Sequence, residues 1–194
     1  MRKSKNIFSP KASRISRVLL IHPHEGWTVE DLSKEAEVSL GFTHAVVMSL
    51  IDQGHVYRDS SYRLRVSDPV KFIQRWAAYH NYTSMNTFLH YHTFEKNIEV
   101  FLSNMKGAYG LEYALTVLAG AHLVAPYVRP TTVHFYIKKE KEAETWVELL
   151  SLRPVEKGGN VSMVLPHDEG VFYGVTQVGG VNVVSKVQLY IDLF

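Results

Sequence analysis

Helix starts and stops follow one another closely in the first eighty residues, and their order limits the folds that this chain can adopt. Ser9-Pro10 is a typical helix start, with serine at the N-cap and proline at the first helical position. That helix is expected to end before His22-Pro23, because the residue before a proline avoids the helical region. Thr28 is the expected N-cap of a second helix, since an acidic residue follows it three positions later.

A third helix, a hairpin and a fourth helix follow. Ser39 is the expected N-cap of the third helix, and Gly54 ends it. Two short alternating segments, 55–58 and 62–65, flank a polar turn and predict a hairpin. Asp68-Pro69 then opens a fourth helix, whose expected inward residues are Val70, Ile73, Trp76 and Ala77. This order is typical of a winged helix-turn-helix, whose third helix can lie in the major groove of DNA with the hairpin beside it.

The third helix divides into a buried and an outward side. Its expected buried line is Phe42, Val46 and Leu50, at a spacing of four. Polar side chains on the other side can bond base edges, and apolar ones can touch thymine methyl groups. The candidate base contacts are Ser39, Leu40, Thr43, His44 and Met48. The candidate phosphate contacts, on the hairpin and the first helix, are Arg58, Arg63, Arg65, Arg14 and Arg17.

Charge supports two interpretations of this half. The formal net charge of the chain is only +2, but the first 24 residues hold six Lys or Arg and no acidic residue. A basic segment favours contact with a polyanion. No Lys or Arg occurs from Ser39 to Gln53, however, and an uncharged helix face can also dock a protein. DNA binding is the first hypothesis, and a protein-interaction module without DNA binding is the alternative.

The second half predicts a mixed α/β unit. The expected strands are 88–92, 132–137, 161–165, 171–178 and 181–184. The expected helices are 93–105, 111–124, 140–150 and 186–194. This alternation implies a sheet with helices packed on it. The predicted fold class is therefore α+β, with a winged helix-turn-helix at 9–80 followed by a mixed α/β domain at 81–194.

Several classes of function are not expected. The chain has no Cys, which excludes disulfides, thiolate nucleophiles and Cys-based zinc sites. The strand at 133–137 has no Asp or Glu, so a nucleotidyltransferase would lack the carboxylates that hold its metal. The histidine pairs 22/24 and 90/92 have no evident third ligand. We therefore expect no enzyme, no catalytic residue, no metal and no cofactor. Apolar runs too short for a bilayer predict no membrane contact and a cytoplasmic location.

Several segments along the chain carry a resemblance to a known family. They are Asp68-Pro69 with Trp76, Tyr113-Ala114-Leu115-Thr116, Ala119-Gly120-Ala121-His122, Ala125-Pro126-Tyr127 with Pro130, Val133 with Tyr136-Ile137, and the closing stretch 183–193. With the order of domains, they resemble the AbiEi-type antitoxins of type IV toxin–antitoxin systems, over nearly the whole chain from about Ser9. The resemblance implies a transcriptional regulator whose winged helix binds operator repeats in double-stranded DNA and represses its own promoter. It also implies that the domain at 81–194 neutralises a nucleotidyltransferase toxin. A homodimer or paired binding on repeats is expected, because one such module contacts only a short site.

Overall fold

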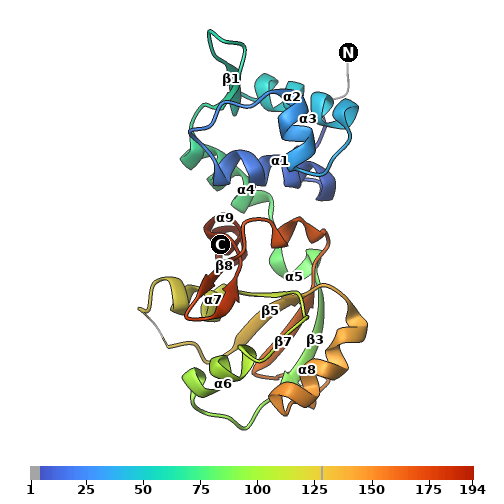
Figure 1. The fold of residues 1–194 in the computed structure, drawn as a ribbon, viewed down its shortest axis with the longest axis vertical. Coiled ribbons are helices and arrows are strands. Elements are labelled where there is room, and N and C mark those ends of the chain that lie inside the picture. The colour runs from blue at the N-terminus through green and yellow to red at the C-terminus, as the bar shows by residue number, and fades with distance from the viewer. Residues whose placement is uncertain (1–4, 128) are drawn as a thin grey trace. The chain divides into compact units, whose positions relative to one another are not determined.

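The computed structural model describes residues 5–127 and 129–194 (Figure 1). The chain forms two compact units. The N-terminal unit comprises the chain up to Asn81 together with Phe194, and the C-terminal unit comprises Tyr82–Leu193. Each unit is described by itself below.

The N-terminal unit has the order of elements that the sequence predicts. Its elements are α1 (Pro10–Ile21), α2 (Val29–Glu35), α3 (Leu40–Asp52), β1 (Val56–Arg58), β2 (Leu64–Val66) and α4 (Pro69–Tyr79). Thr28 caps α2 by accepting a hydrogen bond from the backbone N–H of Asp31, and Asp68 caps α4 in the same way. Ser39 stands at the N-cap of α3 without a side-chain capping bond. Gly54 follows α3 with a φ of +75°, which favours glycine.

Two of the predicted apolar faces are rotated. On α3 the buried residues are Thr43, Val46, Val47, Ser49 and Leu50, whereas Phe42 is only half-buried. On α4 Val70 is exposed, and Phe72 is buried in its place. Both helices have apolar residues on more than one side, so a spacing of four does not fix the phase of the helix. As a result, Thr43 lies on the inner side of α3.

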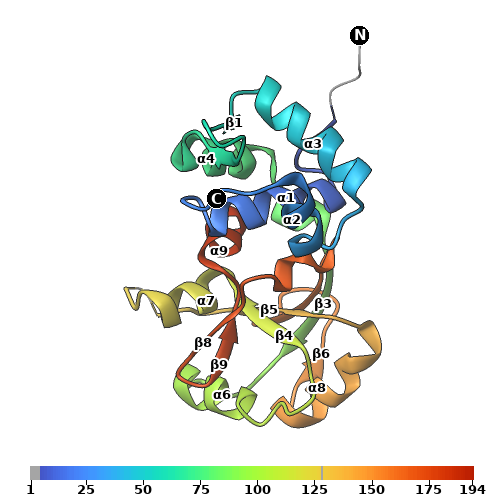
Figure 2. The same cartoon turned by 45° about the horizontal axis from the view of Figure 1, so that its top comes forward.

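The C-terminal unit is built around one mixed sheet of seven strands, in the order β6-β3-β7-β5-β4-β9-β8 (Figure 2). The strands are β3 (Thr87–His92), β4 (Tyr113–Thr116), β5 (Val133–Ile137), β6 (Arg153–Pro154), β7 (Val161–Leu165), β8 (Thr176–Val178) and β9 (Val181–Val183). The helices are α5 (Tyr82–Met85), α6 (Ile98–Met105), α7 (Val117–Val124), η1 (Glu140–Glu142), α8 (Ala143–Leu150), η2 (Glu169–Phe172) and α9 (Lys186–Leu193). The pairs β5–β7 and β4–β9 are parallel, and the other pairs are antiparallel.

Both faces of this sheet are covered, and successive strand residues point to opposite faces. Phe135 belongs to the cluster formed with α6 and α8, where its ring lies 4.9 Å from that of Trp146. Its neighbour Tyr136 belongs to the cluster on the other side, together with Leu189 of α9. The fold is thus the predicted α+β class, with helices packed on a multistranded sheet.

Three predicted segments of the C-terminal unit are wrong in type or extent. The expected helix 111–124 is strand β4 followed by α7, because all four residues of β4 are buried between β5 and β9. Of the expected strand 171–178, residues 176–178 form β8, while η2 covers 169–172. The helix expected from residue 93 begins at Ile98. Within the described residues, no helix combines the length and the apolar character that crossing a membrane requires.

Candidate nucleic-acid interface

The outward side of α3 presents an uncharged surface. Leu40, Gly41, His44 and Met48 are exposed on the helix, and Ser39 is exposed at its N-cap. Leu40 is 54% exposed. A helix of 13 residues is about 20 Å long, enough to follow a stretch of major groove. The predicted contacts Ser39, Leu40, His44 and Met48 therefore share one accessible side of the unit.

Two predicted contacts do not lie on an accessible surface. Thr43 is 0% exposed on the inner side of α3, so its assignment as a base contact is wrong. Arg17 is 1% exposed, and its guanidinium lies over the ring of Trp76, 5.1 Å from the ring centroid. This cation–π contact keeps Arg17 inside, so its assignment as a phosphate contact is also wrong. Arg14 is half-buried on α1.

The hairpin holds its three arginines in defined positions. Arg58 donates to the backbone oxygen of Tyr62 at 3.2 Å. Arg63 pairs with Asp31 of α2 at 3.4 Å. Arg65 donates to the Asp59 carboxylate at 2.6 Å and to the backbone oxygen of His24 at 2.9 Å. These contacts order the hairpin and partly compensate its charge.

Asp59 organises the turn of the hairpin. Its Oδ1 accepts the backbone N–H groups of Ser61 and Arg63, and its Oδ2 accepts from Arg65. The bond from Arg65 is the main reason that the pKa of the Asp59 carboxyl lies below its ordinary value. Tyr62 follows with a φ of +58°, and its side chain is 79% exposed. The turn thus projects an aromatic ring into solvent beside the arginines.

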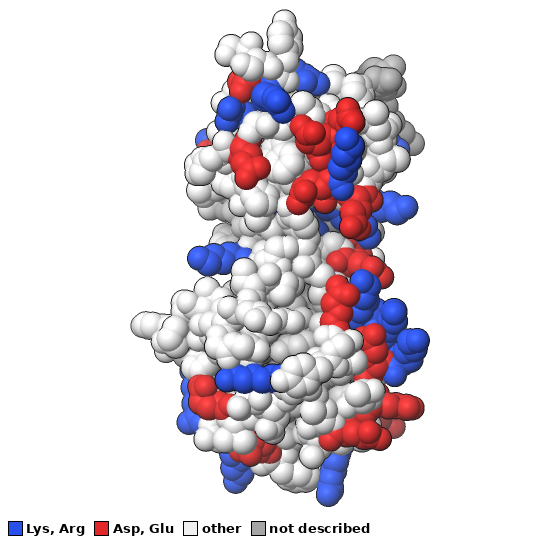
Figure 3. Space-filling view, viewed as in Figure 1, with Lys and Arg blue, Asp and Glu red and all other residues white. Residues whose placement is uncertain are grey.

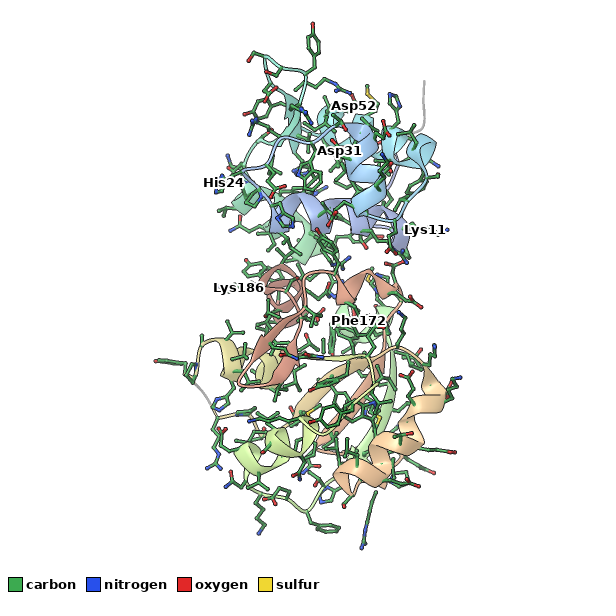
Figure 4. The ribbon with its side chains drawn as sticks, viewed as in Figure 1. Lys11, His24, Asp31, Asp52, Phe172 and Lys186 are labelled. Atoms are coloured by element: carbon green, nitrogen blue, oxygen red, sulfur yellow. The ribbon has the colours of Figure 1, made fainter. Side chains whose placement is uncertain are left out.

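Acidic groups lie close to α3 and the hairpin. Asp31 of α2 and Asp52 at the end of α3 are labelled in Figure 4. The hydroxyl of Thr28 donates to Asp31 and is the largest cause of the lowered pKa of that carboxyl, so Asp31 is ionised well below neutral pH. Figure 3 shows blue and red side chains next to one another over the N-terminal unit. A polyanion would therefore meet a surface of mixed sign.

Sequence reasoning missed two cations that the fold brings next to α3. The backbone N–H of Lys5 donates to Ser49 of α3 at 3.0 Å, and the Lys5 amine lies 5.7 Å from the ring centroid of Phe42. Lys5 and Arg75 of α4 line a pocket of about 290 Å³ with Gln53, the C-cap of α3. The basic start of the chain was a signal for Lys5, whereas no local pattern marked Arg75.

The C-terminal unit holds a buried polar network instead of an evident reactive centre. Asp192 of α9 accepts hydrogen bonds from Thr116 at 2.6 Å, from Tyr136 at 3.0 Å and from Gln188 at 2.8 Å. Tyr136 and His134 occupy the strand in which a nucleotidyltransferase would need two carboxylates. Among the described residues, no three His, Asp or Glu side chains gather in a way that would hold a metal ion.

The family comparison gives the class of the protein. Residues 65–194 match the family described as transcriptional regulator, AbiEi antitoxin, type IV toxin–antitoxin system. The match runs from β2 to the end of the chain and covers about two thirds of it, so the class is that of a transcriptional regulator. The chain belongs to the AbiEi antitoxin family, which confirms the resemblance seen in the sequence over these residues. Comparisons with curated proteins and with solved structures gave no match.

Proposed function

We propose that the N-terminal unit is a winged helix-turn-helix that binds operator DNA, and that the chain thereby represses its own promoter. The observation that carries the proposal is the pairing of an accessible α3 surface with an arginine-bearing hairpin in one small unit. Membership of a family of transcriptional regulators supports it, although residues 9–64 lie outside the family match.

In the proposed complex α3 lies in the major groove. Ser39 and His44 bond base edges, and Leu40 and Met48 contact thymine methyl groups. Because α3 itself has no Lys or Arg, the phosphate contacts come from elements around it. The proposed phosphate contacts are Arg58, Arg63, Arg65, Arg14, Lys5 and Arg75.

Arg63 of the hairpin can exchange its partner at little cost. The Arg63–Asp31 pair is exposed on both sides, and exposed pairs of this kind contribute little to stability. A phosphate can therefore replace Asp31 beside Arg63. Arg65 differs, because its bonds to Asp59 and to the backbone of residue 24 fix its position before DNA arrives. We expect Arg65 to meet a phosphate from this fixed position while it also orders the hairpin, and Arg63 to reach a phosphate by leaving Asp31.

The partners follow from the same function. One such unit covers only a short site, so two copies on operator repeats, with or without a stable homodimer, would give the affinity that repression needs. As an antitoxin, the chain would act against a nucleotidyltransferase-like toxin. A repressor must be in the same compartment as the DNA that it binds, so this function also agrees with the cytoplasmic location expected from the sequence.

The test is a gel shift with the DNA upstream of the gene that encodes this chain. The purified full chain should retard this DNA at low salt, and a shuffled duplex of equal length and composition should bind more weakly. Binding should weaken steeply as salt rises, because phosphate contacts release counterions. No retardation of either duplex at low salt would refute the proposal.

The alternative function is a protein-interaction module. It is favoured by one observation, the uncharged and partly apolar outward side of α3, with Leu40 and Met48 exposed and acidic residues nearby. In that case a neighbouring gene product, rather than DNA, would cover α3. Co-purification with that product, lost in Leu40→Asp and combined with an absent gel shift, would favour the alternative.

A further inference from the structure

A second pocket lies within the C-terminal unit, apart from the residues assigned to DNA. It has a volume of about 540 Å³, in the range of pockets that hold small molecules. One wall is the segment 92–98, which leads into α6 (Figure 1), and the other is the segment 129–133 before β5. Asn160 lies between the two walls.

The walls of this pocket are held in place by the protein itself. The Asn160 side chain accepts the backbone N–H of Thr93 at 2.8 Å and donates to the backbone oxygen of Thr93 at 3.0 Å. The backbone oxygen of Asn160 accepts the N–H of Val133 at 2.9 Å. Asn160 thus forms hydrogen bonds with both walls of the pocket. A preformed pocket needs little ordering when a ligand binds, which favours affinity.

The charge of the lining favours an anion. Lys96 and Arg129 both line the pocket, and neither has an ion-pair partner among the described residues. Glu95 is the one carboxylate among the described residues of the lining, and its Oε1 already accepts the backbone N–H of Asn97 at 2.7 Å. An anionic group would satisfy the two cations, and a guanidinium suits phosphate in particular.

The lining also offers an aromatic surface. Phe94 is 66% exposed although it lines the pocket. The Arg153 guanidinium lies over its ring, 4.9 Å from the centroid, and the His92 ring meets it at 79° with centroids 4.9 Å apart. Because one face of Phe94 is already covered while most of the side chain remains exposed, the ring has surface left for stacking with a flat ligand.

We propose that this pocket binds a nucleoside phosphate, with the base stacked on Phe94 and the phosphate held by Arg129 and Lys96. The buried side chains of Ile98, Phe101 and Val133 supply the apolar part of the lining. The site is independent of the proposed DNA surface, so it stands whether or not the N-terminal unit binds DNA.

The test is isothermal titration calorimetry of the full chain with AMP, GMP, CMP and UMP, without DNA. The four matching nucleosides and inorganic phosphate serve as partial ligands. At least one nucleotide should bind, and for that nucleotide the matching nucleoside and phosphate alone should each bind at least about tenfold more weakly. Phe94→Ala should weaken nucleotide binding about tenfold, as expected for loss of one stacking contact.

Arg129→Gln should weaken nucleotide binding by a similar factor and should leave the weak binding of the free nucleoside unchanged. Lys157→Gln removes an exposed cation outside the pocket and is the matched control, which should bind as the unchanged chain does. Circular dichroism confirms that each variant is folded, and Phe94→Leu replaces Phe94→Ala if that variant unfolds. No binding of any of the four nucleotides at millimolar concentration, or equal binding by folded Phe94 and Arg129 variants, would overturn the proposal.

Discussion

Asp59 and Asp192 each accept hydrogen bonds from three groups, but in opposite surroundings. Asp59 lies in the hairpin turn and binds two backbone N–H groups and Arg65 at the surface. Asp192 is 6% exposed and binds Thr116, Tyr136 and Gln188 between α9 and the sheet. The first carboxylate orders a surface that can meet a ligand, whereas the second attaches a helix to the core of the C-terminal unit.

This difference predicts that the hairpin residues act mainly on binding and that the residues around Asp192 act mainly on stability. The Arg63–Asp31 pair of the N-terminal unit is exposed, so it contributes little to folding and can exchange partners. The polar network around Asp192 is buried, where an unmatched group is costly. Substitutions at the hairpin should therefore change DNA affinity with little loss of stability, and substitutions around Asp192 should do the reverse.

The largest expected effect is that of Asp192→Ala. Removing the carboxylate leaves the hydroxyls of Thr116 and Tyr136 buried without this acceptor, which should lower the free energy of unfolding by about 3 kcal/mol. Urea denaturation followed by circular dichroism measures this loss of stability. The control is Asp52→Ala, an exposed acid for which we expect less than about 0.5 kcal/mol. Equal losses in the two variants would remove the contrast between surface and core.

Loss of the hairpin arginines should have the next largest effect, and mainly on DNA binding. The double variant Arg63→Ala with Arg65→Ala should weaken binding to every duplex about tenfold or more. The slope of log K against log salt should fall by about two, one for each phosphate contact. Fluorescence anisotropy at several salt concentrations measures both. An unchanged slope would exclude the hairpin from the interface.

Asp31→Asn should have a smaller effect of opposite sign. The variant frees Arg63 from its ion pair and removes a negative charge near the phosphates, so affinity should rise about threefold at low salt. The advantage should disappear at high salt because both charges are exposed. Anisotropy with the same duplex measures the change, and Glu144→Asn in α8 is the matched control. A lower affinity for Asp31→Asn would show that Asp31 assists binding.

The smallest expected effect is a pH dependence of stability carried by His55. Burial, and then the charge of Arg75, lower the pKa of His55 below its ordinary value of 6.5. The unfolded chain therefore binds the proton more readily, and the contribution of neutral His55 is complete above pH 6.5 and lost as the pH falls.

Thermal unfolding between pH 7.5 and 5.5 measures this effect. His55 stacks on Phe72, with ring centroids 4.6 Å apart, so His55→Phe keeps an aromatic ring there and should reduce the loss of stability on acidification. His134 of the C-terminal unit also has a lowered pKa and should account for part of the loss that remains. An unchanged pH profile in His55→Phe would contradict the assignment.

The sequence predicted the N-terminal unit well because its signals are local. The caps at Thr28 and Asp68, and Gly54 after α3, act within a few residues of the chain. Strand β4 was missed for the opposite reason. Tyr113–Thr116 is a strand because it pairs with residues 134–137 on one side and with Val183 on the other, and no pattern within the segment shows this.

Parts of both candidate sites also depend on distant contacts. Lys5 reaches α3 by bonding Ser49, and Arg75 reaches the same region from α4, so neither position could be inferred from spacing. Thr43 was misplaced because α3 is apolar on several sides, and its helical phase is decided by packing. The nucleotide pocket joins three separate segments, and only the fold brings them together.

Tethered cleavage of DNA tests most directly whether α3 lies in a groove. Because the chain has no Cys, His44→Cys gives a single attachment point for an iron chelate that cuts nearby DNA. The labelled protein should cut the upstream duplex within a few base pairs of one position in each operator repeat. The same label on Lys157→Cys, in the C-terminal unit, should not give those cuts. A labelled protein that still retards the duplex but cuts nowhere from position 44 would contradict the account.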